Sequence, residues 1–126
     1  MKDIIEKLSV LEQKLAEEHD DFALFAIFQR EEAPRNKLDI VVSADWFGKD
    51  DKETLRFMID NIQAALTREE MLTLSKVVVL QPSELFVQDI VNDIQVEHGA
   101  TEFTYRDFNG MLMKHAYIVT AKPVAA

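Results

Sequence analysis

The sequence predicts an α+β domain in which about three helices cover a mixed five-stranded sheet. Two observations carry this prediction: helical and strand-like apolar periods alternate along the chain, and an Asn-Gly pair separates the last two strand-like runs. The expected order of elements is α-β-β-α-β-α-β-β. The 126 residues, 48% of them hydrophobic, suffice for one core but not for two ordinary domains. We therefore expect residues 1–126 to form a single domain, with 121–126 as a loose C-terminal tail.

A helix and a buried strand are expected first. Apolar residues recur every three or four positions near the N-terminus, as on one face of a helix. They are Ile4, Leu8, Leu11 and Leu15. Asp3, with Glu6 three residues later, has the spacing of a capping box. In the run 22–28 the odd and the even positions are both apolar, which indicates an interior strand with both faces covered. Turn-forming residues in 31–37 then lead to a strand at 38–43, expected to be its antiparallel neighbour.

A second amphipathic helix is expected after residue 50. Asp50 and Glu53 repeat the capping pattern, and Thr67 with Glu70 predicts a further cap for a short helical turn. The run 76–80 is apolar and β-branched, so we expect another interior strand, joined to the 38–43 strand by a right-handed parallel crossover. A third amphipathic helix follows Pro82.

Asn109-Gly110 predicts a hairpin with a type I′ turn, because both turn positions take positive φ. A two-residue turn pairs Phe108 with Met111 and fixes the register of both strands. The more apolar face, expected to meet the core, holds Phe103, Tyr105, Leu112, Ala116 and Ile118.

The other face of this hairpin is polar. Its candidate residues are Glu102, Thr104, His115 and Tyr117. A histidine beside a carboxylate is the elementary general-base pair, since the anion favours and orients the imidazolium. The same residues also stabilise an ordinary solvated strand face without any chemistry. The other histidines, His19 and His98, are expected at element ends as surface or capping residues.

The segment 43–51 contains the only tryptophan, beside three carboxylates. The ligand-binding candidates here are Asp45, Trp46, Phe47 and Asp50. Loops that follow a strand and precede a helix commonly bind ligands, because loops converge and backbone N–H groups are free there. The structural alternative is that Asp50 caps the next helix while the two aromatic residues cover the sheet edge.

Asp39, together with Asp45 or the pair Asp20-Asp21, is the metal candidate. Two such carboxylates can hold a phosphate-bound Mg²⁺ in a phosphoryl-transfer or hydrolytic enzyme. The surrounding motif is missing, and three glycines cannot supply a glycine-rich phosphate loop. The absence of cysteine excludes thiol nucleophiles, disulfides and cysteine-bound metals. We expect no cofactor.

Charge favours some partners over others. With 23 acidic and 14 basic residues, the net charge is −9, which disfavours nucleic acid and anionic membranes. The N-terminus lacks the apolar stretch of a signal peptide, and no run approaches membrane-spanning length, so a cytoplasmic protein is expected. Residues 77–105 contain no Lys or Arg. The acidic surface candidates in this segment are Glu84, Asp89, Asp93 and Glu97.

The leading functional prediction is a non-enzymatic interaction or regulatory module. Its partner would be a protein, favoured to be basic, or a second copy that pairs through an uncovered hairpin edge to form a homodimer. Two alternatives stay open: a divalent-metal-dependent phosphoryl-transfer or hydrolytic enzyme that uses Asp39 and Asp45, and a small-molecule binder with Trp46 in its pocket.

Overall fold

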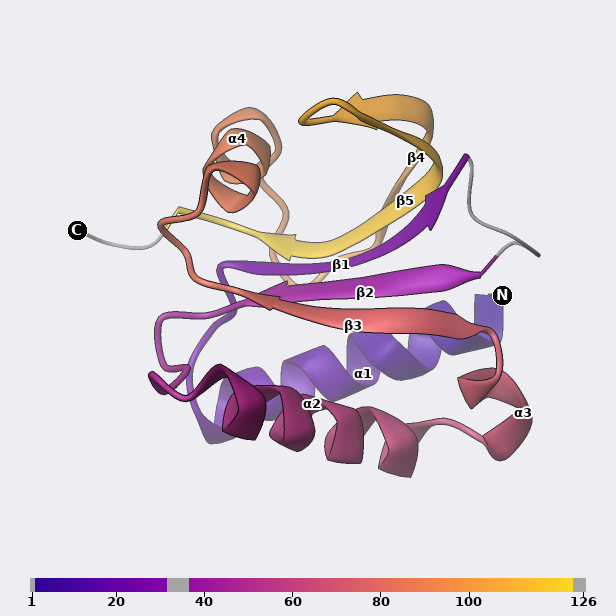
Figure 1. Cartoon of the computed structure of the whole chain (residues 1–126), viewed down its shortest axis with the longest axis vertical. Coiled ribbons are helices and arrows are strands. Elements are labelled where there is room, and N and C mark those ends of the chain that lie inside the picture. Colours follow the sequence, from indigo (N-terminus) through magenta and orange to yellow (C-terminus); the bar gives the residue numbers. More distant parts are fainter. Residues whose placement is uncertain (1, 32–36, 124–126) are drawn as a thin grey trace.

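A computed structural model describes residues 2–31 and 37–123. One mixed five-stranded sheet has the strand order β3-β2-β1-β5-β4 (Figure 1). The strands are β1 (Leu24–Arg30), β2 (Leu38–Ser43), β3 (Leu74–Leu80), β4 (Thr101–Phe108) and β5 (Met111–Ala121). The helices are α1 (Lys2–Glu18), α2 (Asp51–Ala65), α3 (Arg68–Met71) and α4 (Leu85–Asp93). The predicted fold class and order of elements are confirmed, and α3 is the short helical turn expected after Thr67.

Strand β1 lies at the centre of the sheet, as its apolar sequence predicts. It pairs antiparallel with β2 and with β5. Its Phe25 and Ile27 belong to the core shared with α1 and α2, whereas Ala26 and Phe28 belong to the core shared with α4. Figure 1 shows α1 and α2 on one face of the sheet and α4 on the other. Both faces of β1 are therefore covered.

Strand β3 is an edge strand, so the prediction of an interior position is wrong. It pairs in parallel with β2 and has no partner on its other side in the strand order. Val77 and Val79 pack in the α1–α2 core, whereas Val78 and Leu80 pack against the α4 side. Its apolar run therefore reflects two covered faces, which a strand can have while one of its edges stays open.

The hairpin has the predicted register, with Phe108 opposite Met111. The prediction that Tyr105 and Leu112 meet the core is wrong, because these side chains are 61% and 43% exposed. Tyr105 has a φ of 47°, and the β1–β5 register shifts between Gln29 and Arg30. These irregularities interrupt the alternation of faces, because a regular strand points successive side chains to opposite sides.

The result is a different apolar face from the predicted one. The buried or half-buried hairpin residues on the α4 side are Phe103, Phe108, Met113, Ala116, Ile118 and Ala121. Of the expected set, Phe103, Ala116 and Ile118 keep their place in the core, and Phe108 and Met113 replace the two exposed residues.

The predicted cap of the first helix and the predicted C-terminal tail also differ from the structure. Helix α1 begins at Lys2, so Asp3 lies inside its first turn, where it faces the positive end of the helix dipole, and does not cap it. Thr67 and Glu70 form the predicted capping box. Ala121 ends β5 and is fully buried, and the Lys122 backbone N–H donates to the Ala23 carbonyl oxygen at 2.9 Å. These two residues are therefore anchored and do not belong to a loose tail.

Residues 124–126 of the predicted tail and most of the predicted 31–37 turn lie outside the described residues. Within the described ranges, the structure contains no helix that is both long and apolar enough to span a bilayer.

The turn of the hairpin supplies a stability test. Gly110 has a φ of 87°, where a side chain is strained, whereas Gly48 lies outside that backbone region and has open space around it. We expect Gly110→Ala to lower the free energy of unfolding by about 1–2 kcal/mol. Gly48→Ala is the matched control, expected to be neutral or stabilising by roughly 0.4–1 kcal/mol. Urea unfolding of both variants measures this, and equal losses would contradict the turn assignment.

Candidate functional site

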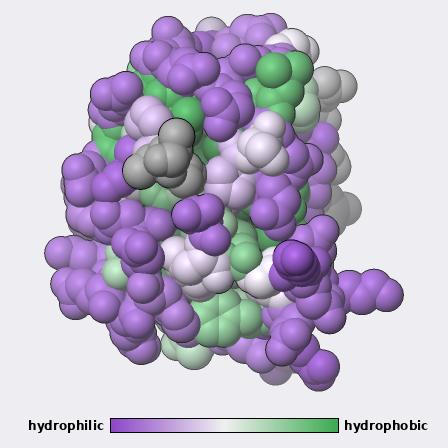
Figure 2. All heavy atoms as spheres, turned by 90° about the vertical axis from the view of Figure 1, so that its left-hand side faces the viewer, coloured by the Kyte–Doolittle hydropathy of each residue, from purple (hydrophilic) through white to green (hydrophobic). Residues whose placement is uncertain are grey.

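Polar residues from four distant segments meet at one end of the sheet. Because β1 is antiparallel to β2 and β5, the start of β1 lies beside the ends of both: Leu24 is opposite Ser43 and Ala121. Residues 96–99 join this end through a bridge between Val96 and Ala121. In Figure 1 these segments lie on the left. Figure 2 shows that side of the molecule, whose surface is mainly hydrophilic with small hydrophobic areas.

Glu12 is a fully buried carboxylate on α1. It accepts a hydrogen bond from the Thr120 hydroxyl at 3.0 Å, and its oxygens lie 2.9 and 3.1 Å from Nδ1 of His98. An isolated buried carboxylate is strongly destabilising, so these partners are required for its burial. Sequence reasoning missed Glu12. The available signal was its position four residues after Leu8, next to the apolar stripe of the helix.

His98 connects this buried carboxylate to the surface. Its backbone has a φ of 48°, and its N–H donates to the Thr120 hydroxyl at 3.1 Å. Its Nε2 lies 3.4 Å from Oδ1 of Asp21. The hydrogen bond with Glu12 raises the pKa of His98, and the nearby charges add to this against an opposing effect of burial. His98 is an exposed residue between two elements, as expected, but its contact with the buried Glu12 was not predicted.

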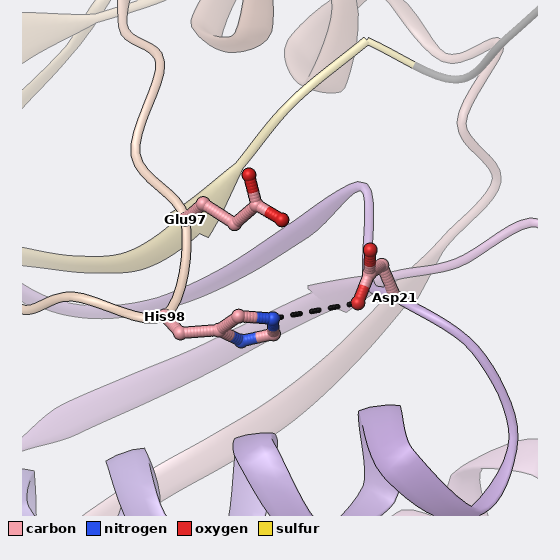
Figure 3. A group of neighbouring side chains, drawn as sticks. All are labelled: Asp21, Glu97 and His98. Atoms are coloured by element: carbon pink, nitrogen blue, oxygen red, sulfur yellow. Dashed lines mark ion pairs between the residues drawn. The ribbon is translucent and has the colours of Figure 1, made fainter.

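Lys122 completes the cluster on the solvent side. Its Nζ lies 2.6 Å from Oδ2 of Asp21 and 3.3 Å from Oε1 of Glu97. The hydrogen bond between Lys122 and Asp21 lowers the pKa of Asp21 and raises that of Lys122. Figure 3 shows the side chains of Asp21, Glu97 and His98 converging, with the ion pair between Asp21 and His98 dashed.

The predicted loop residues lie at the same end of the sheet. Asp45 is exposed and lines an open hollow of about 220 Å³ together with Asp20, Asp21 and Lys122. The structure thus brings Asp45 to the Asp20-Asp21 pair. Asp50 caps α2, since its side chain accepts hydrogen bonds from the backbone N–H groups of residues 52 and 53.

The aromatic residues of this loop line a second, larger hollow. Its volume is about 440 Å³, and its wall includes His19, Trp46, Phe47 and Phe57. The Trp46 ring stacks on the His19 ring with centroids 4.5 Å apart. The indole Nε1 is buried and has no hydrogen-bond partner among the described residues. Trp46 and Phe47 also pack against the core, as the structural alternative predicts.

Asp39 and Asp45 are not brought together. Asp39 lies near the start of β2, and Asp45 follows its end. Six residues of extended chain span about 20 Å. Asp39 is buried, and its Oδ2 accepts a hydrogen bond from Nε of Arg30 at 2.8 Å. This ion pair compensates the Asp39 charge within the sheet.

The polar hairpin face forms in part as predicted. Glu102 lies 3.1 Å from Nδ1 of His115, whose ring stacks on Tyr117. Burial, followed by the hydrogen bond with Glu102, raises the pKa of Tyr117. Thr104 is exposed opposite His115. These contacts describe a partly solvated strand face.

The acidic candidates near α4 are divided among several contacts. Glu84 accepts a hydrogen bond from the Gln81 backbone N–H, Asp93 pairs with Arg106, and Glu97 pairs with Lys122. Asp89 is exposed on α4. The sequence candidates therefore do not form one continuous free acidic surface.

Comparison of the chain with protein-family models, with curated proteins and with solved structures found no match.

The pairing of His98 with Glu12 predicts a pH dependence of stability. Because the folded state raises the pKa of His98 above 6.5, its contribution is complete below that value and is lost as the pH rises through the folded-state pKa. We expect the loss of unfolding free energy in His98→Ala to be larger near about pH 6 than near about pH 9. Urea unfolding in the presence of EDTA measures this difference.

His115→Ala is the matched control for this experiment. Its partner Glu102 is exposed, and an exposed pair contributes only about 0–1 kcal/mol. A loss in His98→Ala that grows with pH would contradict the role assigned to the charged imidazole.

Proposed function

We propose that the chain is a non-enzymatic interaction module that binds a basic protein through the surface formed by α4 and the β4–β5 hairpin. One observation carries this proposal. Among the described residues, six large hydrophobic side chains are exposed, and four of them belong to this surface. They are Leu85 (68%), Tyr105 (61%), Met111 (39%) and Leu112 (43%). Exposed apolar side chains beside polar ones on neighbouring elements are typical of protein interfaces.

The charges around these apolar residues favour a basic partner. Asp89, Asp93 and Asp107 line a hollow of about 270 Å³ between α4 and the hairpin, and Arg106 is the one basic residue in its wall. Arg106 pairs with Asp93 and lies over the ring of Phe103. Asp89 and Asp107 remain exposed, and complementary charge increases both association rate and specificity.

The backbone of β4 argues against a homodimer built on continuous strand pairing. β4 is an edge strand, which offers unpaired backbone groups to a second copy. However, the positive φ of Tyr105 interrupts the strand near its middle. An irregular edge pairs poorly with another strand, so contact through side chains is favoured.

A basic amphipathic peptide of Leu and Lys is a suitable probe. We expect the double variant Tyr105→Ser/Leu112→Ser to weaken its binding by about tenfold, as the loss of central apolar contacts does. The matched control is Val10→Ser/Leu72→Ser, which removes two exposed apolar side chains from α1 and from the segment after α3. Fluorescence anisotropy at low and moderate salt measures both affinities.

The salt dependence of binding and the oligomeric state of the chain can each contradict the proposal. Charge-assisted binding weakens as salt rises, because screening shortens the reach of the exposed carboxylates. Equal weakening in the two double variants, or affinity indifferent to salt, would contradict the proposal. Sedimentation that shows a dimer of the wild-type chain, dissociated by Tyr105→Ser, would replace the basic partner with a second copy.

A small-molecule site at the Trp46 hollow is the second candidate function. The observation that favours it is the hollow of about 440 Å³ whose wall includes the rings of His19, Trp46, Phe47 and Phe57. The ligand class is therefore a planar aromatic compound, which can stack on these rings.

The single tryptophan reports directly on this second candidate. We expect planar heteroaromatic amides to shift or quench its fluorescence, and His19→Ala to weaken that response because it removes the stacked ring. His115→Ala, far along the hairpin, is the control. An unchanged spectrum across the panel would exclude the hollow as such a site.

A further inference from the structure

The side chains of Asp21, Glu97 and His98 present a set of metal-binding atoms at the end of the sheet. One ligand atom from each lies within 4.8 Å of the others. The Nε2 of His98 and Oδ1 of Asp21 are 3.4 Å apart. Ligands bonded to zinc at about 2.1 Å in a tetrahedron are about 3.4 Å from one another. This pair is therefore already at the separation that a shared ion needs, and Glu97 faces it (Figure 3).

A second observation, outside these three residues, concerns the orientation of the imidazole. Glu12 is fully buried and lies 2.9 Å from Nδ1 of His98, an arrangement that suits the neutral tautomer in which Nδ1–H donates to Glu12 and Nε2 offers its lone pair to an ion. Thr120 holds both ends of this arrangement, because its hydroxyl accepts from the His98 backbone and donates to Glu12. Metal-binding histidines characteristically donate their other ring N–H to a carboxylate in this way.

The charge balance of the cluster also favours a cation. Glu12, Asp21 and Glu97 are three carboxylates, whereas the basic groups are the Lys122 ammonium and the His98 imidazole, so the cluster is net negative whether or not the imidazole is protonated. Lys122 bridges Asp21 and Glu97, so a cation already occupies the side of the cluster that faces solvent. Its side chain is about one-third exposed and has a flexible stem, so it can leave toward water.

We propose that Asp21, Glu97 and His98 bind a divalent transition-metal ion, with zinc as the best fit, and that the ion displaces the Lys122 ammonium. One imidazole nitrogen and two carboxylate oxygens suit zinc, whereas magnesium prefers oxygen ligands alone. Three protein ligands leave a fourth position for water. Glu12 is a positioning residue, since it acts on the ion only through His98.

The test uses Zn²⁺ alone, added to the full chain after removal of metals with EDTA. Calorimetry is expected to show one ion bound per chain, and Co²⁺ is expected to give the visible absorption of a tetrahedral site with a nitrogen ligand. His98→Ala is expected to weaken zinc binding at least about tenfold, and Glu12→Gln by about 10–100-fold. His115→Ala is the control, because His115 also pairs with a glutamate but lacks a third ligand residue in the described structure.

The Lys122→Met variant distinguishes a direct effect on zinc binding from an effect of misfolding. Removal of the competing ammonium is expected to tighten zinc binding, a gain that misfolding cannot produce. The proposal would be overturned by an absence of zinc binding to the wild-type chain, by equal weakening in His98→Ala and His115→Ala, or by unchanged or weaker binding in Lys122→Met. Circular dichroism of each variant confirms that the fold is retained.

Discussion

A carboxylate without access to water must have its charge compensated inside the protein, and Glu12 imposes this constraint on one end of the sheet. Its partners are His98 and Thr120, which lie 86 and 108 residues away along the chain. The requirement therefore joins α1, the end of β5 and the segment between α4 and β4. Removal of His98 leaves the buried Glu12 carboxylate with only the Thr120 hydroxyl, so these elements depend on one another for their positions.

This constraint fixes a segment that has little regular structure of its own. Residues 94–100 connect α4 to β4 and contain one isolated bridge, from Val96 to Ala121. The His98 side chain and the Gly99 N–H, which donates to the Val119 carbonyl oxygen, provide two further attachments. A Cβ on Gly99 would lie 3.0 Å from Val96 Cγ1, so this close approach favours glycine. Both backbone hydrogen bonds and the His98 side chain therefore hold a segment that has little regular secondary structure.

The sequence predicted those features that depend on neighbours in the chain. The two covered faces of β1 follow from apolar residues at both odd and even positions of one short run. The turn follows from Asn109-Gly110, a pair of adjacent residues that readily take positive φ. The open edge of β3 was missed, since an apolar run reports covered faces and carries no information about edges. The exposure of Tyr105 was not predicted, because its positive φ breaks the regular alternation of β4 side chains between the two faces of the sheet.

The candidate site was the part least accessible to sequence reasoning. Asp45 was found as a loop residue, but its approach to Asp20 and Asp21 depends on the antiparallel pairing of β1 with β2. Glu12 and His98 stood in separate predicted elements, and nothing local indicates that they meet. Only the placement of an acid beside a leucine stripe signalled that Glu12 needed a distant partner.

Residues 94–100 connect the polar cluster to the proposed docking surface. This segment leaves α4 at Ile94 and enters β4 at Thr101, the two elements whose exposed side chains form that surface. A change in the charge of His98 affects the contacts of the 94–100 segment, which connects these elements. A change in the charge of Asp39 affects only its separate ion pair with Arg30. Two sites influence each other only when each ligand favours one arrangement of a common element. The 94–100 segment is therefore a physical route by which a cation at Glu97 and His98 would bias the orientation of α4 against the hairpin.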